Sequence, residues 1–444
     1  MTTEAEIAIP QSAEDIAPSW VQKVLQKDLP GVIITDVHVK GSISEGEGFM
    51  SDIIAFDAVG TRNGTSQRYS LVAKLTDFKR PLTLFKQWSK DIQIKAETIE
   101  VKFYTSAVPE LMSVAAPIAE RESKAGNDES HPPADSWFLS PKCYFAATDP
   151  SSMVSVRVME NLKSQGFSIK ANLQPLSREE MMLAVGALAQ VHGLSHRLEL
   201  RSGIPLPEKY DWILTRLDST DAVDIVTYQY QAAVKGFAAA FPDQADLVSR
   251  LEKLDPNRIL NLEEDQRLKA LCHAECCVNN IMFKYAGDVP TEARLVDWQS
   301  PMYMPPTYDL TLLFLSAAGW DVLHNHRDAI LAHYHHKLHE TLGPNGEKPH
   351  YQCRISQYNK RIKIGCYVFF FFSLMNTRSV LHSNKRHILL EFPGLQSYTL
   401  EQLKADFKAD CVYGVINRLL RLQVLAADPD LVRMLQEIKE WGVI

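Results

Sequence analysis

The sequence predicts an α+β protein in which a small strand-rich part precedes a large helical part. Between residues 32 and 75, short β-branched runs alternate with turn residues, a pattern typical of antiparallel strands. From Ser177 onward, helical periodicity dominates the rest of the chain. Strands and helices do not alternate regularly, so the sequence does not favour a doubly wound parallel sheet.

The strand-rich part is expected to begin with a helix and continue into three strands. Strands are predicted at 32–39, 51–56 and 69–75 because these runs are rich in β-branched and apolar residues. Residues 61–67 contain Asn-Gly, which indicates a hairpin turn between the last two strands. Residues 12–28 predict an amphipathic helix, whose apolar face is formed by Ile16, Trp20, Val21, Val24 and Leu25.

The next segments connect the two parts of the chain. Helical spacing is expected over 84–106, and residues 154–159 predict another strand. Residues 160–166 are interpreted as a connector, and Ser177 and Glu180 form a capping box that begins the first long helix. The predicted division is an N-terminal helical extension at 1–29, an N-lobe at 30–160 and a C-lobe at 161–444.

The composition is that of an ordinary globular protein and excludes several functions. The formal net charge of −7 provides no basic field for nucleic acid or an anionic membrane. Seven cysteines, an odd number in a long chain, indicate reduced thiols and a cytoplasmic location. The acidic N-terminus lacks the apolar core of a secretory signal. The apolar run from Ile364 to Met375 is shorter than the ~20 residues that cross a bilayer, so we expect a buried helix there and no membrane insertion.

The polar residues with the clearest chemical pattern lie between His273 and Asp297. Glu275 precedes Asn280 by five residues, and Asp297 follows a predicted strand hairpin at 281–296. Because the outer ends of a hairpin's strands lie side by side, we expect Glu275, Asn280 and Asp297 to lie close together. Phosphoryl transfer needs such a set. One carboxylate takes the proton of the attacking hydroxyl, while an amide and a second carboxylate bind magnesium.

The same segment resembles the catalytic loop of the ecdysteroid kinase-like family, which is grouped with choline and aminoglycoside kinases. The family pattern is H-G-D-L-W-V-N-N-I-M-F-K-Y followed by D-F-Q, and residues 278–285 match it without a gap. Asp297-Trp298-Gln299 stands where the family has D-F-Q. Further similar segments are Gly46-Glu-Gly-Phe-Met-Ser51, Leu71-Val-Ala-Lys74, Glu100-Val-Lys-Phe-Tyr104, Val158-Met-Glu-Asn-Leu162, Leu188-Ala-Gln-Val-His192 and Pro306-Thr-Tyr-Asp-Leu310, so the resemblance covers most of the chain.

The resemblance implies a two-lobe protein-kinase-like fold, with a small antiparallel-sheet N-lobe and a large, mainly helical C-lobe. Such a protein is a kinase that transfers the γ-phosphate of ATP to a small-molecule hydroxyl group. Lys74 would pair with Glu100 and contact the α- and β-phosphates, while Asn280 and Asp297 would bind Mg²⁺. Glu275 takes the catalytic-base position. The other residues implied in these roles are Gly46 and Gly48 in the nucleotide-covering loop, Glu160 and Leu162 at the adenine-binding hinge, and His273 and Asp309 as braces of the catalytic loop.

The implied acceptor is a small molecule, and a steroid alcohol such as an ecdysteroid is one example. The chain lacks D-F-G and A-P-E segments after Asp297, which disfavours a protein substrate. No nucleic acid partner is expected, and no oligomeric state is indicated. Aromatic residues of the C-lobe predict the floor of an apolar acceptor pocket, namely Trp320, Tyr367, Phe369–Phe372 and Trp441.

The chain departs from the family pattern at the catalytic loop. Glu275 stands in place of Asp, Ala274 in place of the preceding Gly, and Cys276-Cys277 in place of Leu-Trp. The added methylene of Glu275 moves the carboxylate by ~1.5 Å, and an uncompensated displacement of this size costs about 100-fold in rate. The alternative function is therefore a nucleotide-binding pseudokinase with little or no transfer activity.

Several of these residues have structural alternatives when they are considered singly. Lys74 suits an ordinary strand edge, and Glu100 is one of several charges, including Glu97, that suit a solvated helix face. The cysteines beside His273 fit no common zinc spacing, and an exposed redox-sensitive thiol is another alternative there. His335 and His339 lack an H-E-x-x-H pattern, which favours a solvated helix.

Overall fold

The structure, a computed structural model, describes most of the chain in separate segments. Gly46 and Gly48 lie outside the described residues, as does the apolar run from Ile364 to Met375 that includes Tyr367 and Phe369–Phe372. The described residues are 7–43, 51–77, 90–115, 140–170, 174–215, 220–260, 267–343, 351–353, 388–390, 395–421 and 428–444.

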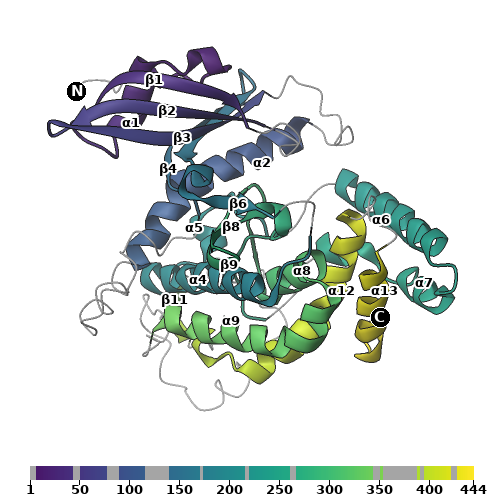
Figure 1. Ribbon diagram of the computed structural model, residues 1–444. Helices are drawn as coiled ribbons and strands as arrows, with labels where there is room; N and C mark the ends of the chain where they lie inside the picture. The colour runs from purple at the N-terminus through teal and green to yellow at the C-terminus, as the bar shows by residue number, and fades with distance from the viewer. Residues whose placement is uncertain are drawn as a thin grey trace, which may run out of the picture.

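The N-lobe is built on one antiparallel sheet of five strands in the order β1-β2-β3-β5-β4 (Figure 1). The Asn-Gly turn between β2 and β3 has positive φ at both Asn63 and Gly64, as a tight hairpin requires, so this prediction is confirmed. Strand β4 was not predicted, because its sequence contains two alanines and no run of β-branched residues. The strands are β1 (Ile33–Ser42), β2 (Asp52–Arg62), β3 (Thr65–Asp77), β4 (Cys143–Asp149) and β5 (Val154–Glu160).

The two faces of this sheet have different neighbours. On one face, Leu71, Ala73 and Leu75 of β3 pack in a cluster with helix α1 (Pro18–Gln26). Four residues of the predicted apolar face, Trp20, Val21, Val24 and Leu25, are buried on α1. The helix begins at Pro18 and not at residue 12, so Ile16 is buried but precedes it, after a separate 3-10 turn. Because side chains alternate along a strand, Val72, Lys74 and Thr76 point to the opposite face.

The opposite face of the sheet carries α2 (Lys90–Lys102), which lies between the sheet and the C-lobe (Figure 1). The helical backbone continues through a π-helical turn at Phe103–Ala107 and on to residue 115. The N-terminal part of the helix predicted at 84–106 lies outside the described residues. This continuation, through Phe103, Tyr104 and Leu111, therefore reaches from the sheet into the core that it shares with the C-lobe.

The C-lobe is mainly helical, and its long central helix is α4 (Arg178–Ser202). The predicted capping box is present, since Ser177 Oγ accepts from the Glu180 amide and the Glu180 carboxylate accepts from the Ser177 amide. Helix α4 packs against α9, and α8 packs against α12. None of the described helices is long and apolar enough to cross a membrane. The other helices are α5 (Leu206–Lys209), α6 (Thr220–Ala240), α7 (Ala245–Leu251), α8 (Thr307–Ala317), α9 (Arg327–Leu342), α12 (Leu400–Arg421) and α13 (Pro429–Glu440).

Short strands of the C-lobe bring the polar segments together. The predicted hairpin is present as β8 (Ile281–Ala286) and β9 (Val289–Leu295), with Ile281 opposite Leu295. The predicted two-lobe α+β arrangement is therefore confirmed. The remaining short strands are β6 (Phe167–Ile169), which pairs with β8, β7 (Ala270–Cys272), which pairs with β10 (Met302–Met304), and the pair β11 (Tyr351–Cys353) and β12 (Ile388–Leu390).

Candidate active site

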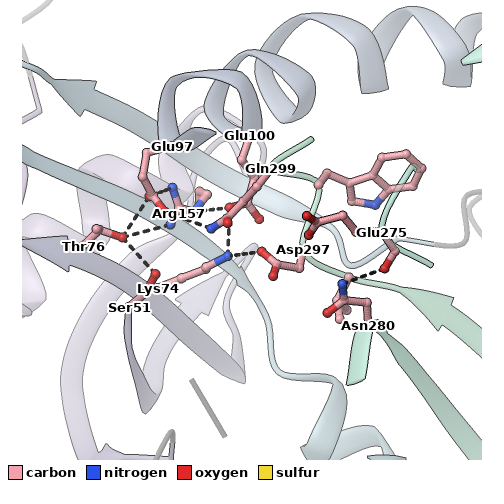
Figure 2. A network of polar contacts seen from close by, with 12 residues as sticks. Ser51, Lys74, Thr76, Glu97, Glu100, Arg157, Glu275, Asn280, Asp297 and Gln299 are labelled. Carbon is pink, nitrogen blue, oxygen red and sulfur yellow. Dashed lines mark hydrogen bonds and ion pairs between the residues drawn. The ribbon is translucent and has the colours of Figure 1, made fainter. Parts of the chain in front are cut away.

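Lys74 lies at the centre of the site, on the face of β3 that is turned toward α2. Its Nζ lies 2.9 Å from Glu100 Oε2 and 2.7 Å from Asp297 Oδ1 (Figure 2). The expected pair with Glu100 is present, and the alternative of an ordinary strand-edge lysine is wrong because the side chain is only 11% exposed. One ammonium group thus joins the sheet, α2 and the segment that follows the β8–β9 hairpin.

The charges of this group stabilise one another. Burial disfavours the charge of Lys74, but the carboxylates of Asp297 and Glu100 outweigh burial and raise the pKa of Lys74 above its ordinary value. Burial likewise opposes ionisation of Asp297, yet Lys74 lowers the pKa of Asp297 below its ordinary value. Lys74 and Asp297 are therefore both charged at neutral pH.

The carboxylates of α2 are buried, so the solvated-face alternative for this helix is wrong. Glu97 and Glu100 are 0% and 1% exposed. Glu97 accepts hydrogen bonds from Thr76 Oγ1 at 2.8 Å and from Gln299 Nε2 at 3.0 Å, and it forms an ion pair with Arg157. Arg157 was not singled out from the sequence, and Gln299 was assigned no role within the matched segment 297–299. A single arginine within the mostly apolar, buried strand Val154–Glu160 was the available signal, because a charge in a buried strand needs a buried partner.

The catalytic loop between β7 and β8 is held by Asp309, in the first turn of α8. Asp309 accepts hydrogen bonds from the backbone N–H groups of His273 and Ala274, both at 2.7 Å, and lies 3.2 Å from His192 Nε2. The His273 ring donates from Nε2 to the carbonyl of Val296 at 2.9 Å. The bracing predicted for His273 and Asp309 is therefore present.

Two residues of the site have a backbone conformation that non-glycine residues rarely adopt. Ala274 has φ of 64° and Asp297 has φ of 67°. In an L-residue this left-handed conformation costs about 1–2 kcal/mol, and strain of this kind concentrates at functional sites. The loop thus keeps the conformation that a glycine would favour, although alanine occupies the position, and the two hydrogen bonds to Asp309 help to hold it.

We expect Asp309→Asn to lower the free energy of unfolding by about 2–3 kcal/mol. The change replaces one of the two carboxylate oxygens, both of which accept hydrogen bonds, with an NH₂ group that can only donate. One of the N–H groups of His273 and Ala274 would then face an NH₂ group. Urea unfolding measures the loss. Asp321→Asn, at a side chain that is 71% exposed, is the matched control and should stay within about 0.5 kcal/mol of the native protein. Equal stabilities for the two variants would contradict the bracing role.

Glu275, Asn280 and Asp297 lie together at the end of the β8–β9 hairpin, as predicted (Figure 2). Asn280 Nδ2 donates to the backbone carbonyl of Glu275 at 2.9 Å. Among the described residues, neither Asn280 Oδ1 nor Asp297 Oδ2 has a hydrogen-bond partner. Amide and carboxylate oxygens are the ligands that Mg²⁺ prefers, so the donor set of Asn280 and Asp297 fits this ion.

The end of β5 and the residues that follow it leave two backbone groups available. Glu160 pairs with Lys142 twice: its N–H donates to the Lys142 carbonyl at 2.9 Å, and its carboxylate accepts from the Lys142 N–H at 2.8 Å. The Asn161 N–H donates to the carbonyl of Ser70 at 3.0 Å. Within the described part of the chain, the Glu160 carbonyl and the Leu162 N–H therefore remain unpaired, with the acceptor two residues before the donor.

Two other sequence interpretations are wrong. Trp320 and Trp441 do not form a pocket floor. The guanidinium of Arg433 covers Trp320 at 5.0 Å, and that of Arg327 covers Trp441 at 4.6 Å, beside α13. His335 and His339 are half-buried rather than fully solvated, because the Nε2 atoms of both lie within hydrogen-bond distance of the Tyr398 carbonyl, at 2.7 and 3.2 Å.

The sequence profile of the ecdysteroid kinase-like family matches residues 45–346. No curated protein sequence matches the chain. Among solved structures, the GDP complex of a mutant aminoglycoside 2'-phosphotransferase-IIIa is 10% identical with a TM-score of 0.38, and the comparison covers 95% of this chain and 97% of that chain. The ADP-bound aminoglycoside phosphotransferase APH(2'')-Ib is 12% identical with a TM-score of 0.33, and 95% of each chain is covered. Because the family profile matches more than half of the chain, from before Lys74 to beyond Asp297, the protein belongs to the ecdysteroid kinase-like family.

Proposed function

We propose that the protein transfers the γ-phosphate of ATP to a hydroxyl group of a small molecule. The observation that carries this proposal is the position of Lys74, whose ammonium group contacts Glu100 and Asp297 at the same time. A lysine held in this way presents a fixed positive charge beside a carboxylate that suits a metal ion. Such a pair is the arrangement that phosphate groups of a nucleotide require.

In this proposal each residue has one task. Lys74 neutralises the α- and β-phosphates, and Glu100 holds it in place. The hydroxyl oxygen of the acceptor forms a bond to the γ-phosphorus while the bond from that phosphorus to the ADP oxygen breaks. Glu275 accepts the proton that the hydroxyl group loses. Asn280 and Asp297 would hold Mg²⁺, which supplies positive charge to the phosphate oxygens.

The hinge favours adenine over guanine. An unpaired carbonyl at Glu160 and an unpaired N–H at Leu162 suit the amino group and the ring-nitrogen acceptor of adenine. Guanine has a carbonyl oxygen and a ring N–H at the corresponding positions, so both hydrogen bonds would meet groups of the wrong polarity. Loss of such hydrogen bonds at buried polar groups produces strong discrimination.

The family supports a small alcohol as acceptor, and its description suggests a steroid alcohol such as an ecdysteroid. The experiment is to measure nucleotide consumption by the purified protein with sterols, choline, aminoglycosides and simple alcohols, each with Mg²⁺ and either ATP or GTP. We expect acceptor-dependent turnover with ATP, at least about 10-fold faster than with GTP. Turnover with GTP alone would contradict the hinge assignment. Absence of turnover with every acceptor would favour the second candidate.

The second candidate is a pseudokinase that binds the nucleotide without transferring phosphate. Its support is the catalytic loop, where Glu275 replaces Asp and Ala274 occupies a left-handed conformation. The available oxygens of Asn280 and Asp297 count against it, because nucleotide binding without catalysis does not require both. Binding of Mg²⁺–ATP without consumption would identify this function.

A further inference from the structure

Three consecutive residues after β9 contact Lys74, α2 or the residue that follows α2, and we name residues 297–299 the clamp segment. Asp297 binds Lys74 directly. The fully buried Trp298 stacks on Phe103, which follows α2, with 4.2 Å between ring centroids and 10° between planes. Gln299 donates to Glu97 at 3.0 Å (Figure 2). Besides the bond from Asp297 to Lys74, this C-lobe segment thus contacts α2 at Glu97 and its continuation at Phe103.

Glu97, the residue that Gln299 contacts, belongs to a buried ionic cluster. Arg157 lies opposite Lys74 in the β3–β5 register, so two cations of neighbouring strands face α2 side by side. Their partners are Glu97 and Glu100, which are three residues apart and therefore on one face of the helix. Arg157 pairs with Glu97, and its Nε also lies 3.3 Å from Glu100 Oε2.

In this cluster Arg157 is the cation nearest to Glu97, and Lys74 is the cation nearest to Glu100. Without Arg157, two buried carboxylates would face one lysine, and the like charges would repel each other. Burial raises the pKa of Glu97, but Arg157 and Lys74 outweigh it and lower that pKa below its ordinary value. Gln299 therefore donates to a charged acceptor, which makes its hydrogen bond stronger than one between neutral groups. Glu97 is thus held by Arg157 of the sheet and by Gln299 of the clamp segment. Glu100 is then free of this task and pairs with Lys74.

We propose that the clamp segment fixes α2 so that the Lys74–Glu100 pair and Asp297 adopt one arrangement, with Gln299 and Arg157 as positioning residues. The inference rests on the proposed function insofar as that arrangement serves a nucleotide. Gln299 acts through Glu97, whereas Asp297 would contact the metal–nucleotide complex itself. Movement of the segment toward or away from α2 then changes the phosphate-binding lysine and the metal-binding carboxylate together.

The test compares Gln299→Leu with the matched control Gln22→Leu. Gln22 is a half-buried glutamine whose side chain joins α1 to neighbouring backbone, donating to the Val32 carbonyl at 2.7 Å and accepting from the Ile34 N–H at 2.6 Å. It lies on α1, on the opposite face of the sheet. Each variant loses the carbonyl oxygen and the NH₂ group of one glutamine side chain, so a general loss of stability affects both. Only a positioning role of Gln299 would make nucleotide affinity and α2 exchange differ between them.

The first measurement is the affinity for Mg²⁺–ADP by calorimetry. Gln299→Leu should weaken binding about 10- to 100-fold, as loss of outer-shell partners does, whereas Gln22→Leu should not change it. In a Lys74→Met background, Gln299→Leu should weaken binding by less than about 2-fold, because the effect passes through Lys74. The same loss in both backgrounds, or no loss in the native background, would overturn the inference.

The second measurement needs no nucleotide. Hydrogen exchange of the α2 amides, followed by mass spectrometry, should become about 10-fold faster in Gln299→Leu and stay unchanged in Gln22→Leu, because α2 loses the hydrogen bond that joins Glu97 to the C-lobe. Unchanged exchange in Gln299→Leu overturns the inference even if the protein binds nucleotide. Native protein that does not bind Mg²⁺–ADP overturns the proposed function instead, and the exchange result still decides whether the clamp segment holds α2.

Discussion

Replacing Asp297 with asparagine is expected to lower the kcat/KM of phosphate transfer by about 10²- to 10³-fold, the usual effect of removing one electrostatic contact with a transferring phosphoryl group. The amide keeps the size of the side chain but loses the negative charge. Lys74 retains Glu100 as a partner at 2.9 Å, so the fold should remain intact. The measurement is steady-state turnover with the acceptor found in the panel, together with Mg²⁺–ADP affinity.

The control for this change is Asp288→Asn, at the exposed turn of the same β8–β9 hairpin. It removes the same charge from the same supersecondary unit, but it lies at the end away from Lys74. Its kcat/KM should stay within about 2-fold of the native value, as is usual for surface substitutions. If Asp297→Asn keeps more than a tenth of the native activity, Asp297 is not a metal ligand of the reaction.

The residues around Lys74 differ in how far the sequence predicted them. Lys74, Glu100 and Asp297 were found because each belongs to a short segment that resembles a family pattern. The hairpin that places Asp297 beside Asn280 was found because strand periodicity and Gly287 mark its strands and turn. Local patterns of this kind depend only on neighbours in the chain, so a single sequence contains them.

The second ionic pair depends on partners that are remote in the sequence. Charges occur on more than one side of α2, so its pattern does not distinguish the buried Glu97 from exposed charges. Burial of Glu97 follows from the register that sets Arg157 opposite Lys74, and from Gln299, which lies about 200 residues away along the chain. Ala274 is a similar case, because the hydrogen bond that helps to hold its positive φ is accepted by Asp309, 35 residues away. Neither contact is visible in local composition.

Glu275 carries the second large expected effect. Glu275→Gln should lower kcat by about 10²- to 10⁴-fold, the usual contribution of a general base, because the amide cannot accept the proton of the acceptor hydroxyl. The KM for ATP should change little, since Lys74 and Asp297 hold the phosphates. The control is Glu292→Gln on β9, which should leave kcat unchanged. It also removes one carboxylate charge, but Glu292 forms a surface ion pair with Lys284. Native kcat in Glu275→Gln would show that another group takes the proton.

Glu275→Asp then decides whether the catalytic loop is adapted to the longer side chain. Asp309 fixes the N–H groups of His273 and Ala274, so the backbone cannot advance to compensate for a shorter residue. If the loop is adapted to glutamate, withdrawing the carboxylate by ~1.5 Å should cost about 100-fold in kcat. If kcat rises instead, the acceptor lies where an aspartate would reach it, and glutamate is the cause of weak transfer. The left-handed Ala274 favours the first outcome, because the loop keeps the conformation suited to glycine while the longer side chain extends from it.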